Sequence, residues 1–316
     1  MQLSKIDISV IICCYNSENR IVPTLEHLSR QTLGQLSCEI ILVDNNCSDG
    51  TIELAKKTWD SIGNPFEIKF IKEKEPGLSF ARKCGVFAAR GEIIILCDDD
   101  NWLFDNYFCK VAEILSNHNI GVTAGNNYES HEEIPPDWFS DVKQFYAVSI
   151  EKRPSRFVDS VWGAGMSFRR KVFMELINSG YIFRNSDRKG NKLTSGGDTE
   201  ICLAISKLGY KIWHDEELEL YHFMPKSRIN VRYAKKMIRS IGSSNLMIQD
   251  LLHEEKRSSR QYQNTIFYKI YVSLIVIGKS YKGYFKLSRH ERIKISLLVQ
   301  YEIGRLIQQL RLIKLF

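Results

Sequence analysis

Short apolar runs alternate with helical patterns through the first 125 residues. Between the runs, apolar residues recur at helical spacing, as in Ile21, Leu25 and Leu28, and a helix over 79–90 is expected to end at Gly91. The runs have the length and β-branched composition of buried parallel strands, and they lie at 6–14, 39–43, 67–71 and 92–96. Strands that alternate with helices predict a parallel sheet covered by helices on both faces.

The pattern changes twice further along the chain. Residues 126–195 are irregular and include an aromatic-rich stretch, and an expected helix over 199–208 and a strand over 211–213 follow them. From residue 225 onwards the chain reads as helices, of which the first is expected over 231–252. We therefore expect an α/β domain over 1–224, divided into halves at 1–125 and 126–224, and a helical extension over 225–316.

Charge separates the same two regions. The 316-residue chain has a net charge of +7, and its 44% hydrophobic and 26% charged residues are ordinary for a soluble globular protein. Residues 225–316 contain 19 Lys and Arg against five Asp and Glu, whereas residues 1–224 contain 25 against 32. This asymmetry indicates two regions with different partners. No nucleic-acid recognition motif accompanies the basic residues, so nucleic acid is not an expected partner.

The eight cysteines all lie in residues 1–224 and show no paired metal-ligand spacing. The N-terminus lacks the basic start and apolar stretch of a signal peptide, so the cysteines are expected to be reduced thiols in a cytoplasmic protein. No run of about 18 apolar residues occurs, and a membrane-spanning helix is therefore not expected.

Polar residues directly follow three of the expected strands. Tyr15 and Asn16 follow the first, Asp44 and Asn46 follow the second, and the triplet Asp98-Asp99-Asp100 follows the fourth. Because ligands of parallel sheets bind at the carboxyl ends of the strands, these side chains should share one rim. The triplet is either a solvated acidic turn or a cation site, and its position on this rim favours a cation site.

The loop after the first strand excludes two common phosphate-binding motifs. Residues 15–20 read YNSENR, so the glycine-rich dinucleotide motif is absent, and no G-x-x-x-x-G-K-S/T sequence occurs in the chain. A diphosphate bound at this rim would have to be neutralised in another way. A divalent cation held by carboxylates would do so, and Mg²⁺ and Mn²⁺ prefer such oxygen ligands.

Five stretches follow one another in order from about residue 8 to 224: SVIICCYN, ILVDNNCSDGT, EPGLSFARKCGVFAARGEIIILCDDDN, WGAGMSFRRKVF and GGDTEICLAISKLGYKIW. Together they resemble the family 2 glycosyltransferases of the GT-A fold. The resemblance implies a Rossmann-like, mostly parallel sheet, a nucleotide-diphosphate sugar donor such as a UDP-sugar, Mn²⁺ or Mg²⁺, and inversion at the anomeric carbon. It also implies a glycan or lipid-linked acceptor in polysaccharide, glycan or glycolipid assembly.

The resemblance also implies a donor site at this rim. Tyr15 would stack on the nucleobase, and Asp44 would accept hydrogen bonds from the base or ribose. Rim packing for Tyr15 and an Asx turn at Asp44 remain open as structural alternatives. Lys83 stands where the family commonly has asparagine, so Arg82 is the favoured donor-site residue of its helix. The full set of implied donor contacts is Tyr15, Asn16, Asp44, Asn46, Arg82, Asp98 and Asp99.

Asp100, Asp98 and His222 are the metal ligands that the resemblance implies. Asp100 is the favoured direct ligand because it lies farthest from the preceding strand. Asp98 would contact the ribose or a metal-bound water. His222 would contact the metal or the diphosphate, or else have a structural role.

Asp198 is the candidate general base, because it occupies the second position of the family's acidic pair, after two glycines and before a helix. Gly197 stands at the first position of that pair. The alternative role of Asp198 is a helix N-cap, and Glu200 is the second candidate base. The acceptor pocket is expected to be formed by Trp162, Gly163, Gly165 and Met166, although core packing remains open for Trp162.

Two other functions remain open at this point. One is a degenerate, non-catalytic transferase that acts as a binding subunit, against which the Asp98, Asp100 and Asp198 set argues. The other is a sugar-nucleotide pyrophosphorylase, which would need a glycine-rich basic loop after the first strand.

The basic extension has two interpretations. Residues 266–278 are apolar but too short to span a hydrocarbon core of about 30 Å, and residues 297–316 combine an apolar face with Arg305, Arg311 and Lys314. Residues 260–316 therefore either lie on an anionic membrane surface, peripherally at the inner face of the plasma membrane, or form a helical bundle or homodimer interface.

Overall fold

The computed structural model describes residues 5–183, 196–253 and 259–313. They divide into two compact units, of which the first contains residues 5–130, 147–183 and 197–223 and the second contains 131–146, 196, 224–253 and 259–313. The segment 131–146 thus belongs to the same unit as the C-terminal helices. The division of residues 1–224 into two binding halves stays a prediction.

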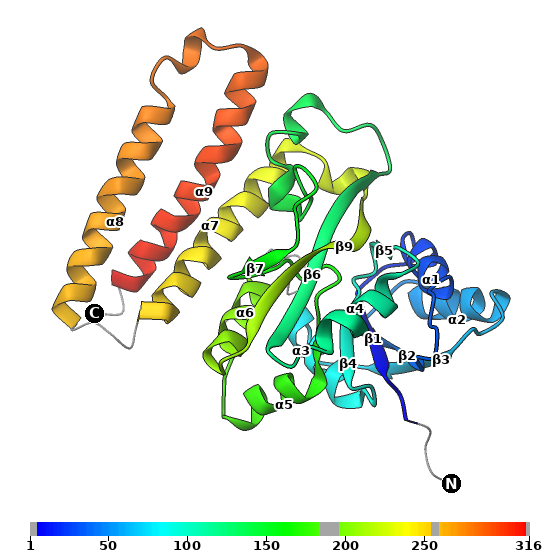
Figure 1. The fold of residues 1–316 in the computed structure, drawn as a ribbon. Coiled ribbons are helices and arrows are strands. Elements are labelled where there is room, and N and C mark those ends of the chain that lie inside the picture. The colour runs from blue at the N-terminus through cyan, green and yellow to red at the C-terminus, as the bar shows by residue number, and fades with distance from the viewer. Residues whose placement is uncertain (1–4, 184–195, 254–258, 314–316) are drawn as a thin grey trace. The chain divides into compact units, whose positions relative to one another are not determined.

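A nine-stranded mixed sheet forms the centre of the first unit, in the order β3-β2-β1-β4-β8-β6-β9-β5, with β7 paired to β9 (Figure 1). Its first four strands pair in parallel, and these are β1 (Ile8–Cys14), β2 (Cys38–Asp44), β3 (Glu67–Lys72) and β4 (Ile93–Leu96). Antiparallel pairs then join β4 to β8 (Ser167–Arg169), β8 to β6 (Ile120–His131), and β9 (Lys211–Met224) to both β5 (Asn101–Leu103) and β7 (Arg156–Val158). The predicted α/β class is confirmed.

Two apolar cores cover the two faces of this sheet. Because successive strand residues point to opposite faces, Val10 and Ile12 of β1 belong to one core and Ile11 to the other. The first core is closed by α1 (Ile21–Ser29), α2 (Thr51–Ser61) and α4 (Tyr107–Leu115). The second core is closed by α3 (Leu78–Ala88), α5 (Arg170–Asn178) and α6 (Gly197–Lys207). The sheet therefore carries helices on both faces, as predicted.

Three of the expected boundaries that differ from the structure concern α3, α6 and β9. Helix α3 ends at Ala88, so Gly91 does not terminate it. A Cβ at Gly91 would lie 2.5 Å from the backbone nitrogen of Ser9, and the glycine therefore lets the chain pass closely beside β1. Helix α6 begins at Gly197 instead of 199, and β9 continues to Met224 instead of ending at 213.

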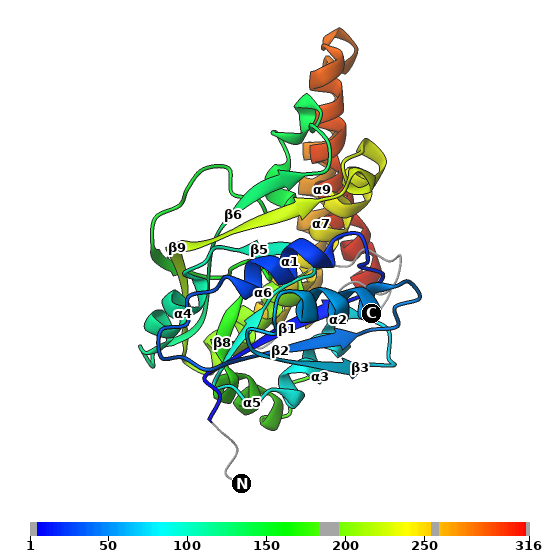
Figure 2. The ribbon, with the colours of Figure 1, turned by 90° about the vertical axis from the view of Figure 1, so that its right-hand side faces the viewer.

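The second unit contains the long helices α7 (Val231–His253), α8 (Ser259–Ser280) and α9 (Arg289–Ile313). Helix α9 lies between α7 and α8 (Figure 1), and α7 and α9 are also adjacent in Figure 2. A Cβ at Gly304 would lie 1.9 Å from the carbonyl oxygen of Arg239, so α7 and α9 approach with almost no space between their backbones. Within the described residues, no helix is long and apolar enough to cross a membrane.

The position of α9 changes the interpretation of residues 297–316. Leu297 and Val299 are buried, so apolar residues of α9 are used in packing inside the helical unit. Asp141 accepts from Lys294 at 2.6 Å and lies 3.0 Å from His290, which ties the segment 131–146 to α9. Part of the apolar face of α9 is therefore used inside the helical unit, and a membrane contact of residues 260–316 stays a prediction. Lys314 lies outside the described residues.

Candidate active site

The aspartate triplet lies between β4 and β5 and is largely buried. Asp99 and Asp100 are only 7% and 3% exposed, and Asp98 is half-buried. The buried side chain of Asn101 shapes this turn, since its Oδ1 accepts from the Asp98 amide at 3.1 Å and its Nδ2 donates to Asp100 Oδ1 at 3.2 Å. A solvated acidic turn is therefore excluded. The burial of like charges requires specific partners.

Arg20 is the partner of Asp99. Its Nε donates to Asp99 Oδ1 at 2.9 Å and its Nη2 to Oδ2 at 2.8 Å, while the Ser17 hydroxyl donates to the same carboxylate. Arg20 also donates to the carbonyl oxygens of Asn16 at 2.9 Å and Tyr15 at 3.3 Å. Burial and the nearby Asp100 raise the pKa of Asp99, and the guanidinium of Arg20 opposes this shift.

The sequence analysis did not identify Arg20 as a site residue. One signal was available, namely a basic side chain in a loop predicted to share a rim with three carboxylates. The contacts show that Arg20 joins the loop after β1 to the triplet. Both carboxylate oxygens of Asp99 are engaged by the protein, and we therefore do not retain Asp99 as a direct donor contact.

The loops after β1 and β2 leave Tyr15 accessible, at 47% exposed. Asn16 and Asn46 adopt left-handed backbone conformations, with φ of 51° and 68°. Their side chains hold the loops, because Asn16 Oδ1 accepts from the Ser48 amide at 2.8 Å and Asn46 Nδ2 donates to the Lys74 carbonyl at 3.0 Å. These two side chains therefore shape the rim around Tyr15.

Asp44, at the end of β2, holds the turn that follows it through a side-chain hydrogen bond that spans three residues, instead of the two of an Asx turn. Its Oδ1 accepts from the Cys47 amide at 2.8 Å. Its Oδ2 lies 3.8 Å from Lys72 Nζ, and the side chain is 18% exposed. The turn engages only one oxygen, so the predicted contact with base or ribose stays open for the other.

Arg82 and Gly163 bring the triplet and Asp198 to one place. Arg82 Nη2 lies 3.3 Å from Asp98 Oδ1, and Gly163 donates its backbone N–H to Asp198 Oδ2 at 3.0 Å. A Cβ on Gly163 would lie 3.1 Å from Arg82 Nη2 and 3.4 Å from Asp198 Cβ. Residues far apart in sequence, on α3, α6 and the loop before β8, thus converge at the triplet.

The two candidate bases differ in their surroundings. Asp198 is half-buried in the first turn of α6, where its Oδ1 accepts from the Thr199 amide at 2.7 Å. Glu200 is 1% exposed and accepts from the Tyr181 hydroxyl at 3.2 Å. A base must reach the acceptor hydroxyl, and this requirement favours Asp198.

Asp100 and His222 form the pair of groups best placed for a cation. Asn101 pairs with His222 across β5 and β9, and His222 Nε2 lies 3.6 Å from Asp100 Oδ1. Two ligands of one cation lie no more than about 4 Å apart when each metal–ligand distance is about 2.1 Å. The buried Nδ1 of His222 has no hydrogen-bond partner in the part of the chain that the structure describes.

Among the described residues, no group of three or more His, Cys, Asp or Glu side chains could hold a metal ion. The pair nevertheless fits Mg²⁺ or Mn²⁺, because Mg²⁺ in particular is usually bound through one or two protein side chains together with water and substrate phosphates. Asp98 is engaged with Arg82 and stands as a secondary candidate.

The predicted acceptor residues divide into two groups. Trp162 is half-buried, with the Arg153 guanidinium 4.7 Å from its ring centroid, and it lies next to Gly163. Gly165 has φ of 71°, and its carbonyl accepts from the buried Tyr107 hydroxyl at 2.8 Å. Met166 is fully buried in the second core. Gly165 and Met166 are thus core residues, and we do not retain them as acceptor contacts.

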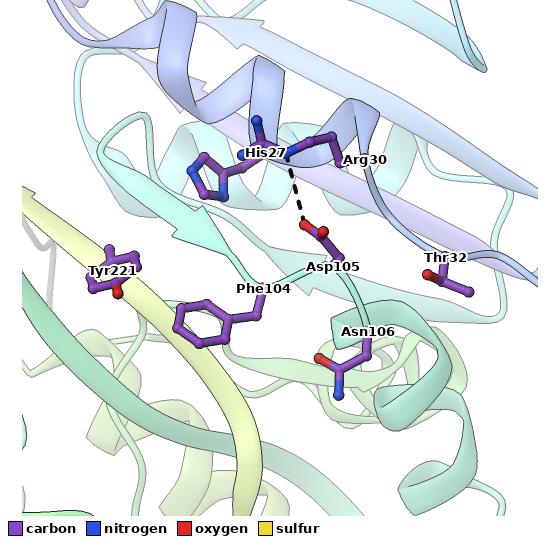
Figure 3. Close-up of a pocket in the computed structure, with 7 residues that line it drawn as sticks. All are labelled: His27, Arg30, Thr32, Phe104, Asp105, Asn106 and Tyr221. Atoms are coloured by element: carbon purple, nitrogen blue, oxygen red, sulfur yellow. Dashed lines mark ion pairs between the residues drawn. The ribbon is translucent and has the colours of Figure 1, made fainter.

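A cavity of about 490 Å³ lies beyond the far end of β5 (Figure 3). Phe104 and Tyr221 form its aromatic side, with ring centroids 5.2 Å apart, and Arg30 and Asp105 pair at 3.8 Å on its polar side. The cavity is lined by His27, Arg30, Thr32, Phe104, Asp105, Asn106 and Tyr221. It is therefore distinct from the rim that carries Tyr15, Asp98 and Asp198.

Residues 9–177 match the family model described as Glycosyl transferase family 2. The chain belongs to this family. Membership in family 2 makes the protein a glycosyltransferase, and the predicted resemblance is confirmed. The match covers the loops after β1 and β2, the triplet and Gly163, whereas Asp198 and His222 lie beyond it.

A relative of this family 2 glycosyltransferase is the glucosyl-dolichyl phosphate glucuronosyltransferase of Haloferax volcanii. The two are 23% identical over 229 residues, which cover 68% of each chain. The similarity thus extends beyond the span of the family model and leaves about a third of each chain unmatched.

Two solved structures share the fold of this glycosyltransferase. S. aureus TarS 1-349 in complex with UDP-GlcNAc gives a TM-score of 0.52 at 14% identity, covering 95% of this chain and 90% of that one. GalNAc-T7 with UDP, GalNAc and Mn²⁺ gives a TM-score of 0.53 at 16% identity, covering 76% and 48%. The similarity at these identities shows the fold, and the predicted GT-A architecture is confirmed.

Proposed function

We propose that this family 2 glycosyltransferase transfers a sugar from a nucleoside-diphosphate donor, a UDP-sugar, to a hydroxyl of a glycan or lipid-linked acceptor, with inversion at the anomeric carbon. The convergence of Asp98 and Asp198 through Arg82 and Gly163, with Asp100 in the same turn as Asp98, carries this proposal. The UDP complexes of TarS and GalNAc-T7 support the donor, and the dolichyl-phosphate relative supports a lipid-linked acceptor. Assembly of a polysaccharide, glycan or glycolipid at the cytoplasmic side of a membrane is the corresponding biological role.

The donor is held at the rim formed by the loops after β1 and β2. Tyr15 stacks on the nucleobase, and Oδ2 of Asp44, which the turn does not engage, accepts a hydrogen bond from the base or ribose. Asn16 and Asn46, which themselves adopt left-handed backbone conformations, hold the shape of these loops. Asp98 faces the ribose. Arg82, paired with Asp98 and only 10% exposed, places a positive charge beside the diphosphate.

Asp100 and His222 would hold the divalent cation, since His222 Nε2 lies 3.6 Å from Asp100 Oδ1. When bound, Mn²⁺ or Mg²⁺ supplies Lewis-acid stabilisation of the negative charge on the leaving diphosphate. Asp99 contributes by positioning, since its ion pair with Arg20 locks the triplet against the loop that carries Tyr15.

Asp198 takes the proton from the acceptor hydroxyl as that oxygen attacks the anomeric carbon. The amides of Gly163 and Thr199 each donate to one of its oxygens and so orient the carboxylate. Trp162 lies beside Gly163 and offers an aromatic face to the acceptor sugar. One displacement from the face opposite the diphosphate inverts the configuration, and no protein nucleophile is required.

Nucleotide release from a panel of nucleotide-sugars, measured with Mn²⁺ or Mg²⁺, tests this proposal. We expect release with at least one UDP-sugar and its loss on chelation of the cation. Binding of a donor without turnover under any of these conditions would instead support a non-catalytic binding subunit.

A further inference from the structure

Helix α8 carries an exposed apolar stripe. Phe267, Tyr271 and Leu274 are 57%, 61% and 53% exposed, and their spacing of four and three residues puts them on one face of the helix. Beyond the end of the helix, Tyr281 and Phe285 are also exposed, at 42% and 91%. We refer to these five residues as the α8 stripe.

The stripe is not the face through which α8 joins its own unit. Ile266 and Ser273 are each 1% exposed, and the Ser273 hydroxyl donates to Glu302 of α9 at 3.0 Å. The packing face of α8 is therefore already occupied by α9. A row of large apolar side chains left in water on the other side marks an interaction surface.

The charge around the stripe identifies its partner. Between Glu255 and Glu291 the chain has eight Lys and Arg residues and no Asp or Glu. Lys279, Lys282 and Lys286 are exposed near the C-terminal half of the stripe. Pairing of α8 with a second copy would bring like charges together with no acidic residue of this segment to compensate them, so the surface suits an anionic partner.

The chemistry of the side chains narrows the partner further. Tyrosine and phenylalanine beside lysine are the side chains that favour the boundary between lipid headgroups and acyl chains. We infer that the α8 stripe docks on the surface of an anionic lipid bilayer, with Lys279, Lys282 and Lys286 at the headgroups. This inference narrows the proposed membrane contact of residues 260–316 to one face of α8 and its following turn.

Co-sedimentation of the full chain with vesicles tests the inference without donor, acceptor or metal. We expect binding to vesicles that contain phosphatidylglycerol, weaker binding at high salt, and little binding to pure phosphatidylcholine. The triple variant Phe267→Ser, Tyr271→Ser, Leu274→Ser should bind about tenfold more weakly or worse. Lys279→Gln, Lys282→Gln, Lys286→Gln, which alters no apolar side chain, should also weaken binding.

A matched control replaces three exposed apolar residues outside the stripe, Ile134, Ile150 and Phe157, with serine and should bind like the unmodified chain. Unchanged binding of the stripe variant would overturn the inference. So would a dimer of the unmodified chain that the stripe variant converts to a monomer in light scattering, because the occupant would then be a second copy. Nucleotide release with soluble substrates is measured separately, so failure of vesicle binding leaves the proposed transfer reaction standing.

Discussion

The backbone N–H of Gly163 donates to Oδ2 of Asp198 at 3.0 Å. The candidate base is thereby attached to the loop before β8 as well as to its own helix, where Thr199 donates to its other oxygen. Arg82 and Asp198 both lie beside the missing side chain of Gly163, since a Cβ there would be 3.1 Å from Arg82 Nη2 and 3.4 Å from Asp198 Cβ, so the glycine leaves room for both the base and the guanidinium. A substitution at Asp198 therefore tests the base itself, whereas a substitution at Gly163 tests the distance between the base and Arg82.

Replacing Asp198 with Asn should lower transfer by about 10²- to 10⁴-fold, because an amide cannot take the acceptor proton. Donor binding, measured by calorimetry, should stay close to that of the unmodified enzyme. Glu200→Gln is the control, because Glu200 is buried against Tyr181. An active Asp198→Asn enzyme beside an inactive Glu200→Gln enzyme would assign the base to Glu200.

Gly163→Ala should reduce turnover while the protein remains folded. The added methyl group would lie 3.1 Å from Arg82 Nη2 and 3.4 Å from Asp198 Cβ, so the guanidinium or the base must shift. Misplacement of such groups by about 1 Å can cost about 10²-fold in rate. Gly34→Ala is a control for alanine substitution itself, since no atom lies within 4 Å of its added Cβ, although its positive φ adds local strain. Full activity of Gly163→Ala would show that this spacing is not required.

Asp100→Asn should abolish the nucleotide release that requires Mn²⁺. The melting temperature should change little, because the amide keeps the shape of the carboxylate. The readout is activity as a function of Mn²⁺ concentration, with His222→Gln expected to raise the concentration required. Asp105→Asn, at an exposed position just beyond β5, is the matched control. Unaltered activity of Asp100→Asn would remove Asp100 from the metal site.

Arg20→Gln should destabilise the protein by about 3–5 kcal/mol, because it leaves the Asp99 carboxylate buried without its cation. Chemical denaturation measures this loss. The double variant Arg20→Gln, Asp99→Asn should recover part of it, since it removes the buried charge as well. If the Arg20–Asp99 pair positions the loop that carries Tyr15, the rescued double variant should also show a raised KM for the donor. A KM unchanged from the unmodified enzyme would restrict the pair to stability.

The stability of the protein should depend on pH through the buried carboxylate of Glu39. Burial alone would raise the pKa of Glu39, but hydrogen bonds from Ser9, Arg90 and Lys69 outweigh it and lower the pKa from 4.5 to about 2. A lowered pKa in the folded state stabilises the protein above pH 4.5, and this stabilisation is lost as the pH falls towards 2. The unmodified protein should exceed Glu39→Gln by about 3 kcal/mol in free energy of unfolding at pH 7. The gap should close at low pH, whereas Glu53→Gln, at an exposed position on α2, should show no such gap.

Much of the fold and of the rim was determined by the sequence itself. The β-branched runs predicted β1 to β4 within two residues at each end, because buried strands of a parallel sheet are apolar on both faces and interrupted by polar turns. The same turns carry Tyr15, Asp44 and the triplet, and the topology of a parallel sheet brings them to one rim. These are local patterns with a fixed geometric consequence.

Only the tertiary structure decided which of these side chains already have protein partners. The sequence does not distinguish Asp98, Asp99 and Asp100 from one another. In the structure Arg20 pairs with Asp99 and His222 lies beside Asp100, because chain segments about 80 and 120 residues away pack there. In the same way, α8 and α9 are both apolar and basic in sequence. Packing buries Leu297 and Val299 of α9 and leaves the stripe of α8 in water, because periodicity defines an apolar face but not the neighbour that covers it.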